Sequence, residues 1–318
     1  MYKTCIDLNT GFFCTFILQN KNKMLIEAFL EYLTFEKNYS KNTIQAYKTD
    51  LIAFKDFCEV EFDQDDLEAI HYNQIRTWIV SLVNSGVSNR SVNRKVSSLK
   101  TFYKFLQKIG EVTINPLASH KALKVQKKIQ TPFEQKEVEE VLKLLNETSD
   151  FESIRDRLIV ELLYSTGMRR IELINVKEKD VDHSKKAIKV LGKRNKERYV
   201  TILPSVYKTL EKYLSEKKEY EIENEEALFI TKKGVKIYET LVYRIINLYF
   251  SRVSTKAKKS PHILRHAFAT HLLNNGASLN SVKELLGHSS LASTQVYTHN
   301  SLEQIKKVYN KAHPREST

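Results

Sequence analysis

The sequence is poor in the residues that bend or cross-link a chain. Its 318 residues include only 8 glycines, 5 prolines and 3 cysteines. So little glycine and proline excludes collagen-like, linker-rich and β-repeat architectures. Cys5, Cys14 and Cys58 are odd in number and lack metal-ligand spacing, so we expect neither a disulfide framework nor a zinc ribbon. A reducing, cytoplasmic location is the simplest expectation.

Long apolar runs are also missing. The most hydrophobic stretch, residues 11–18 (GFFCTFIL), is far shorter than the ~20 apolar residues of a transmembrane helix. No small-residue cleavage site follows it, so we expect neither a secretory signal nor a membrane partner. Hydrophobic residues still make up 42% of the chain, which excludes wholesale disorder. The length predicts two domains.

Positive charge is what the sequence has in excess. Lys and Arg number 51 against 38 Asp and Glu, a formal charge of +13. The segment from Gly86 to Lys128 holds ten basic residues and one acidic residue. Like charges four apart on a helix repel each other, so this concentration favours a surface that follows the phosphates of a nucleic acid. An ordinary solvated basic face is the alternative. The candidate DNA-binding residues are Arg90, Arg94, Lys95, Lys100, Lys104, Lys121 and Lys124.

Four amphipathic patterns predict a small helical domain over residues 24–110. Helical spacing of apolar residues begins at Met24, and Ser40 has the character of an N-cap for a second helix. The third pattern covers Asn73–Asn84, and the fourth runs from about Ser88 to residue 108. Four helices are enough for one domain with its own core.

Two segments lack this periodicity. Residues 1–23 are short and mixed in character, so we expect a leader, not native to the working chain, and a natural start at Met24. Periodicity lapses again around Asn115–Pro116 and Thr131–Pro132, which predicts a basic interdomain linker over residues 111–132.

The second domain, residues 133–318, mixes helices with a hairpin. Helical patterns cover Phe133–Leu145 and Glu152–Tyr164, and Ser165-Thr166-Gly167 ends the second. Two β-branched runs, Ala187–Leu191 and Tyr199–Leu203, predict a β-hairpin before helices return. The expected fold is mainly α, with a four-helix N-terminal domain and an α+β C-terminal domain that contains a small antiparallel sheet.

Histidines gather near the end of the chain. Six of the nine lie in the last 57 residues. A zinc site would use His262, His266 and His271, but no Glu stands between them as in HExxH, and Arg265 would lie beside the cation. A phosphate site explains more, because His262 and Arg265 are three residues apart on one helix face and both donate to anions. We expect His266 and His271 to support helix packing.

Four motifs follow one another in a fixed order. They are Tyr164-Ser165-Thr166-Gly167-Met168-Arg169 with Glu172-Leu173, Gly192-Lys193, His262-Ile263-Leu264-Arg265-His266, and Leu286-Gly287-His288-Ser289-Ser290. Tyr297 stands nine residues after His288. This order resembles the signature of the tyrosine recombinase (integrase) family, and the length is most similar to the Xer branch. Arg194 stands where relatives commonly have Gly, and Met168 replaces the usual Leu, but neither change removes a catalytic group.

The resemblance implies a role for each matched residue. It makes Tyr297 the nucleophile that forms a 3′-phosphotyrosyl bond with DNA, without a metal or another cofactor. Arg169, Arg265 and His288 would hold the phosphate oxygens. Lys193 would be the general acid, His262 would accept a proton or donate a hydrogen bond near Tyr297 and the phosphate, and Glu172 would orient the site. Lys196 and Tyr309 are the rival candidates for general acid and nucleophile.

The resemblance also implies partners. They are double-stranded DNA with a specific recombination site and further subunits, which form a homo- or hetero-tetramer on two duplexes. In relatives the segment after the nucleophile packs on a neighbouring subunit, and residues Ser301–Thr318 have the pattern of a short helix that could do so or cap its own core. We expect Xer-like resolution of chromosome or plasmid dimers. A mobile-element integrase, a type IB topoisomerase and an inactive DNA-binding module stay as alternatives.

Overall fold

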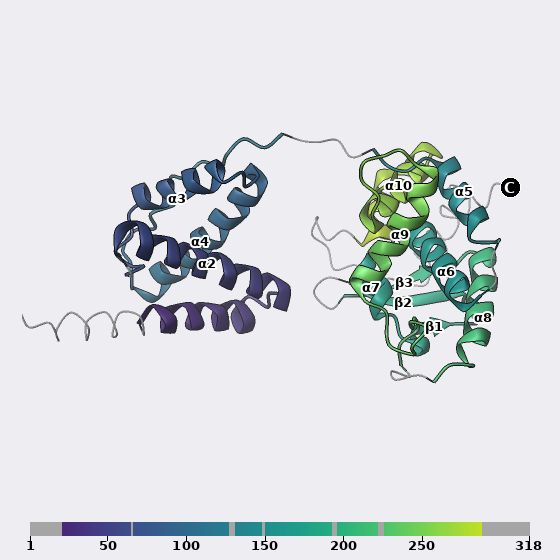
Figure 1. The fold of residues 1–318 in the computed structure, drawn as a ribbon. Helices are drawn as coiled ribbons and strands as arrows, with labels where there is room; N and C mark the ends of the chain where they lie inside the picture. Colours follow the sequence, from purple (N-terminus) through teal and green to yellow (C-terminus); the bar gives the residue numbers. More distant parts are fainter. Residues whose placement is uncertain are drawn as a thin grey trace, which may run out of the picture. The chain divides into compact units, whose positions relative to one another are not determined.

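The computed structural model describes residues 21–64, 66–126, 131–147, 150–192, 196–221 and 226–287. The chain divides into two compact units, Met1–Lys128 and Ile129–Thr318, here the N-terminal and C-terminal units (Figure 1). Within the described ranges, no helix has the length and apolar character needed to cross a bilayer.

The three long helices of the N-terminal unit begin within one residue of the predicted positions, whereas the first helical segment already includes residues 21–23. Ser40 Oγ accepts a hydrogen bond from Thr43 N at 3.3 Å, which confirms the predicted N-cap. Ser88 caps the next long helix in the same way, and Gly110 ends it in the left-handed conformation. The elements are residues 21–31, η1 (Tyr32–Glu36, a π-helix), α2 (Lys41–Phe62), α3 (Tyr72–Asn84) and α4 (Asn89–Ile109).

Aromatic side chains fill the core of this unit. Phe54 meets Trp78 edge-on with ring centroids 5.0 Å apart, and Phe29 meets Phe102 at 5.3 Å. Tyr103 is fully buried and donates its hydroxyl to the carbonyl of Leu67 at 2.9 Å. This core orients α4, so that its polar face with most of the predicted DNA-binding residues is directed outward.

Both segments without periodicity differ from the expectation at their edges. Residues 21–23, expected in the leader, are helical, and Asn22 is buried and accepts a hydrogen bond from Leu67 N. In the expected linker 111–132, Leu123 N and O both bond to the side chain of Asn93 at 2.9 Å, and Asn89 donates to Lys124 O at 2.9 Å. The chain is therefore fixed to α4 as far as Lys124. Residues 1–20 and 127–130 lie outside the described residues.

Helix α6 (Phe151–Thr166) is the centre of the C-terminal unit. Fourteen of its 16 residues are buried, most of them apolar, as expected for a helix surrounded by others. It packs against the helices α5 (Gln135–Leu144), α7 (Arg170–Asn175), α8 (Pro204–Lys217), α9 (Glu239–Val253) and α10 (Pro261–Asn274). The short helix α11 (Leu279–Leu286) packs on α10. The short 3-10 turn η2 (Glu178–Asp180) precedes the sheet.

A small antiparallel sheet completes this unit. Its strands are β1 (Val181–Asp182), β2 (Ala187–Leu191) and β3 (Glu197–Thr201), in that order across the sheet (Figure 1). The mainly α fold with a small antiparallel sheet is thus confirmed. Strand β3, the second strand of the predicted hairpin, begins two residues earlier than predicted, because Glu197 and Arg198 pair with Leu191 and Val190 despite their charge. Strand β1 was missed, since two residues carry no alternating pattern.

Gly167 ends α6 in a position that no other residue fits. Its φ is +59°, in the left-handed region that glycine adopts without strain. A Cβ atom there would overlap the ring of Phe268 in α10 and lie 2.9 Å from Cδ2 of Leu286 in α11. The backbone at the end of α6 therefore lies directly against two other helices.

We predict that Gly167→Ala destabilises the C-terminal unit far more than Gly276→Ala does. Gly276 also has a positive φ, +86°, but no atom lies within 4 Å of its Cβ position. Both variants are destabilised by the left-handed backbone conformation, and in Gly167→Ala overpacking lowers the free energy of unfolding by about a further 1–3 kcal/mol. The free energy of unfolding in denaturant measures the difference. Equal losses would mean that the end of α6 accommodates a side chain after all.

Candidate active site

Arg169 is held at the start of α7 by Glu172. Its backbone N donates to Glu172 Oε2 at 2.8 Å, and its Nη1 donates to Oε1 at 2.7 Å. The side chain is about a third exposed, so the other edge of the guanidinium remains accessible. The residue is therefore both the N-cap of α7 and an oriented cation that is partly exposed to solvent.

Glu172 is also bound by Arg198, which lies on β3. Arg198 Nη1 donates to Oε1 at 3.0 Å and Nη2 to Oε2 at 2.8 Å, a two-pronged ion pair. Burial by itself would raise the pKa of Glu172, but the hydrogen bonds and charges of Arg198 and Arg169 outweigh it, and the pKa is lowered. Glu172 is thus a buried, ionised carboxylate at neutral pH.

Arg265 on α10 joins the ends of two other helices. Its Nη1 donates to Gly167 O after α6, and its Nη2 donates to Leu286 O in α11 at 2.8 Å. Burial, together with the charges of Arg169 and Arg198, lowers its pKa to about 10. The side chain is therefore still protonated at neutral pH.

The three arginines meet at the segment that leads to His288. Arg169 Nη2 donates to Gly287 O at 3.4 Å, and Arg198 lies 3.3 Å from the Cβ position of Gly287. We call Arg169, Arg198, Arg265 and Glu172 the arginine cluster. Three guanidinium groups and one carboxylate leave a net charge of +2, which suits a phosphate group and its negatively charged reaction intermediates.

The sequence-predicted residues are distributed unevenly over the structure. Arg169, Arg265 and Glu172 are brought together, and His262 is an exposed residue in the first turn of α10. Lys193, His288 and Tyr297 lie outside the described residues, as do the rival Tyr309 and the expected tail helix. The rival Lys196 has a backbone carbonyl that accepts a hydrogen bond from Gly192 N at 2.7 Å.

Arg198 is the one residue of the cluster that no sequence motif indicates as a site residue. The pairing of the hairpin strands could have indicated it, because Arg198 lies opposite Val190 and the side chain of Val190 is buried. An arginine in such a place needs a carboxylate partner. That partner, Glu172, is 26 positions away in the sequence.

The histidines of α10 do not form a metal site in the part of the chain that the structure describes. No group of three or more His, Cys, Asp or Glu side chains there is arranged to hold a metal ion. His271 shares a hydrogen bond with the Tyr164 hydroxyl at 2.9 Å, and burial lowers its pKa. His271 thus supports packing as expected, whereas His266 is exposed and does not.

In the N-terminal unit, two of the predicted DNA-binding residues are organised by a buried acid. The carboxylate of Asp50 is 1% exposed and accepts from Arg94 Nη1 at 2.7 Å and Nη2 at 3.0 Å. It also accepts from Lys95 Nζ at 3.0 Å and Ser98 Oγ at 2.8 Å. The side chain of Arg94 is 51% exposed, so Asp50 fixes a cation that still faces solvent. Of the other predicted residues, Lys100 is half-buried and the exposed ones are Arg90, Lys104, Lys121 and Lys124.

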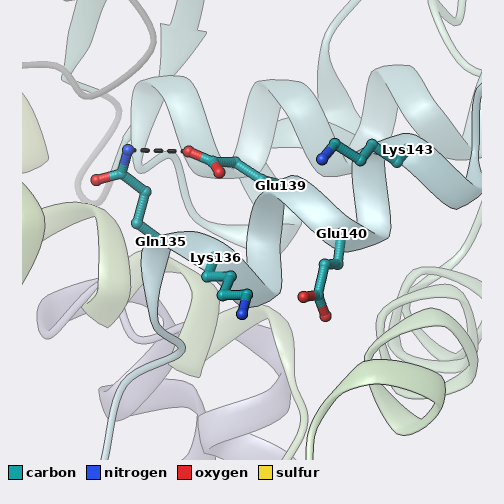
Figure 2. A pocket seen from close by; sticks show the side chains of 5 residues that line it. All are labelled: Gln135, Lys136, Glu139, Glu140 and Lys143. Atoms are coloured by element: carbon teal, nitrogen blue, oxygen red, sulfur yellow. Dashed lines mark hydrogen bonds between the residues drawn. The ribbon is translucent and has the colours of Figure 1, made fainter.

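A hollow on the outer side of α5 has a different character (Figure 2). It is lined by Gln135, Lys136, Glu139, Glu140 and Lys143. Gln135 donates to Glu139 across its edge at 2.9 Å, and two acids balance two lysines. Its lining shares no residue with the arginine cluster, and its balanced charge gives no preference for an anion.

Comparison with known proteins places this geometry in a family. The model of the phage integrase family matches residues 132–304, and the model of the phage integrase N-terminal SAM-like domain matches residues 26–110. Tyrosine recombinase XerC of Staphylococcus aureus strain MSSA476 is 40% identical over 289 residues, which cover 91% of this chain and 96% of the relative. The chain belongs to the phage integrase (tyrosine recombinase) family. It is a Xer-type site-specific tyrosine recombinase similar to XerC, a DNA strand-transferring enzyme, and the resemblance seen in the sequence is confirmed.

Solved structures agree with the recombinase fold. XerH bound to its palindromic difH substrate, a post-cleavage complex, has a TM-score of 0.68 at 22% identity and covers 88% of this chain and 79% of that one. A lambda integrase dimer bound to a COC' core site has a TM-score of 0.63 at 20% identity, with coverage of 86% and 99%. Both likenesses extend over the fold of most of the chain.

We predict that Glu172→Gln destabilises this recombinase at neutral pH by about 1.5–3 kcal/mol, the value of hydrogen bonds to a charged group. Because the folded protein lowers the pKa of Glu172, the carboxylate stabilises the fold above its unfolded pKa of about 4.3, and this stabilisation disappears as the pH falls through the folded value. The difference between wild type and variant in free energy of unfolding should therefore shrink below that pH.

Glu226→Gln is the matched control. Glu226 pairs with Lys177 and Lys179 at the surface, where ion pairs stabilise little, so its loss should leave stability nearly unchanged at every pH. A Glu172→Gln effect that does not vary with pH would contradict an ionised Glu172.

Proposed function

We propose that this recombinase cuts and rejoins DNA at a specific site through a 3′-phosphotyrosyl intermediate, with Arg169, Lys193, His262, Arg265, His288 and Tyr297 as its catalytic residues. The observation that supports this most directly is the arginine cluster. It directs two matched residues of the family set at the two positions that precede the third, His288: Arg169 donates to Gly287 O and Arg265 to Leu286 O.

The reaction transfers the scissile phosphoryl group from the DNA 5′-oxygen to the tyrosine oxygen without an external energy source. The Tyr297 oxygen attacks the scissile phosphorus, loses its proton, and forms a P–O bond as the bond to the 5′-oxygen breaks. His262 accepts the phenol proton, and Lys193 delivers one to the departing 5′-oxygen. The covalent intermediate keeps the bond energy, so a 5′-hydroxyl of another strand can reverse the step without ATP.

The arginines would stabilise the intermediate state. The pentacovalent phosphorane carries more negative charge on its non-bridging oxygens than the starting diester does. Arg169 and Arg265 are held by Glu172 and by backbone carbonyls before any substrate arrives, so they pay little reorganisation cost. Losing one preorganised donor of this kind lowers a rate by about 10²–10³-fold.

The N-terminal unit would bind the DNA backbone through the basic residues of α4 and the segment behind it. Asp50 fixes the guanidinium of Arg94 and the ammonium of Lys95 next to each other by hydrogen bonds. Such phosphate contacts fix register but carry no sequence information. The residues proposed for this surface are Arg90, Arg94, Lys95, Lys100, Lys104, Lys121 and Lys124.

In the cell, we propose a cytoplasmic enzyme that works as a homo- or hetero-tetramer on two duplexes and resolves chromosome or plasmid dimers. The 40% identity to a protein named tyrosine recombinase XerC supports this role over that of a mobile-element integrase. Covalent trapping on genomic DNA, followed by sequencing of the captured fragments, distinguishes the two. A chromosomal dimer-resolution site supports the proposal, and capture at the ends of a mobile element would replace it.

Tyr297→Phe should bind a nicked suicide duplex normally but form no covalent protein–DNA adduct, because only the phenol oxygen can make the bond. Tyr309→Phe is the control and should give the wild-type amount of adduct. Arg265→Ala should lower the rate of adduct formation by about 10²–10³-fold. Denaturing gels with labelled DNA measure all three. An adduct that persists in Tyr297→Phe and disappears in Tyr309→Phe would move the nucleophile to Tyr309.

Arg94→Ala should weaken DNA binding and make it less dependent on salt. Each phosphate contact contributes about 0.9 to the slope of log K against log salt, so losing Arg94 should reduce that slope by about one contact. Lys48→Ala is the control and should leave the slope unchanged, because Lys48 is an exposed lysine of α2 outside the proposed surface. Fluorescence anisotropy at several salt concentrations gives both slopes. An unchanged slope in Arg94→Ala would remove this residue from the DNA surface.

A further inference from the structure

Arg198 holds the carboxylate that orients Arg169. Glu172 accepts four hydrogen bonds, two on each oxygen: Arg169 N, Arg169 Nη1, and the two Nη groups of Arg198. A carboxylate has about four acceptor positions, so these donors fill it. Arg198 supplies half of them and is 10% exposed, which makes this ion pair the most buried one of the cluster.

The consequence for Arg169 follows from competition. Arg169 gives Glu172 only one side-chain N–H, and its Nη2 turns to Gly287 O instead. Without Arg198, the buried carboxylate would have two acceptor positions empty, and a guanidinium prefers to fill such positions with two parallel bonds. Arg169 would then rotate onto Glu172 and lose donors that its phosphate needs. Arg198 thus keeps Arg169 available.

The side chain of Arg198 also packs closely against two glycines, Gly192 and Gly287. Its guanidinium lies 3.4 Å from the Cβ position of Gly192 and its Nε, Cδ and Cζ lie 3.3 Å from that of Gly287. These glycines directly precede Lys193 and His288 in the sequence. A side chain at either glycine would crowd the arginine. Because both positions are glycine, both backbone segments can approach the guanidinium of Arg198 closely.

One donor of Arg198 is still unused in the described part of the chain. Its Nε is buried and has no hydrogen-bond partner there. An unsatisfied buried donor is costly, so Arg198 stabilises the fold less than an arginine with all its donors paired would.

We propose that Arg198 is a positioning residue for strand cleavage. It saturates Glu172 so that Arg169 keeps its donors for the phosphate, and it seats the segments that lead to Lys193 and His288 on one guanidinium. This inference rests on the proposed function, since it acts through the residues assigned there.

The test compares single-turnover cleavage of a suicide duplex by the full chain and four variants. Arg198→Met keeps the length of the side chain and removes the donors, and it should slow adduct formation by about 10–100-fold, with DNA binding within about twofold of wild type. The double variant Arg198→Met with Glu172→Gln should recover at least about tenfold of that loss, because a neutral amide no longer draws Arg169 away. Arg198→Lys should fall between wild type and Arg198→Met.

Lys256→Ala controls for loss of stability. Lys256 forms a half-buried ion pair with Glu137 in the same unit, so the variant should lower the melting temperature without slowing cleavage. If Arg198→Met slows cleavage only in proportion to its loss of folded protein, Arg198 is structural and the proposal is wrong. If Arg198→Lys cleaves like wild type and Glu172→Gln gives no rescue, Arg198 acts by charge alone and the proposal is equally wrong.

The same gels separate this inference from the proposed function. A wild-type protein that forms no adduct at Tyr297 contradicts the proposed function itself. A wild-type adduct together with an unchanged rate in Arg198→Met contradicts only the role of Arg198.

Discussion

The organisation of the candidate active site depends on one buried carboxylate. Glu172, on α7, joins Arg169 in the turn after α6 to Arg198 on β3. Burying a charge is costly unless it is paired and hydrogen-bonded, and here the pairing is complete. The ion pairs with Arg169 and Arg198 offset the desolvation cost of Glu172, and of these two arginines Arg169 must also face a substrate. The charge arrangement of the arginine cluster therefore comes from the fold and exists before DNA binds.

The N-terminal unit repeats this device on a smaller scale. Asp50 is as buried as Glu172 and likewise holds two basic side chains, of which Arg94 is half exposed. In both units an acidic residue stands behind the cations and not between them and the solvent. Such an arrangement reduces the rotamer freedom that a long basic side chain would otherwise lose on meeting a phosphate.

Most of the fold was predictable because its helices are long and strongly periodic. Caps such as Ser40 and breaks such as Gly167 are local signals, and they gave the boundaries within one or two residues. Strand β1 is too short to carry a pattern. The catalytic candidates were predictable from motif order, but Arg198 was not, since its partner is 26 positions away and only tertiary structure joins them. The N-terminal boundary of the expected linker differs for a similar reason, because the amide side chains of Asn89 and Asn93 bind backbone groups of Leu123 and Lys124 without any periodic signature.

These two asparagines have a consequence for how far the units can separate. The chain is anchored on α4 as far as Lys124, and it is anchored again at Phe133, which is buried and stacks on Phe250 with ring centroids 4.0 Å apart. Nine residue steps remain between the anchors, and a fully extended chain covers about 3.3–3.6 Å per step, which limits the span to about 30 Å. A tether this short gives one unit a local concentration in the millimolar range around the other. Under the function proposed above, DNA bound by one unit would be presented to the other at this concentration, so that weak affinities of the separate units would multiply into one strong one.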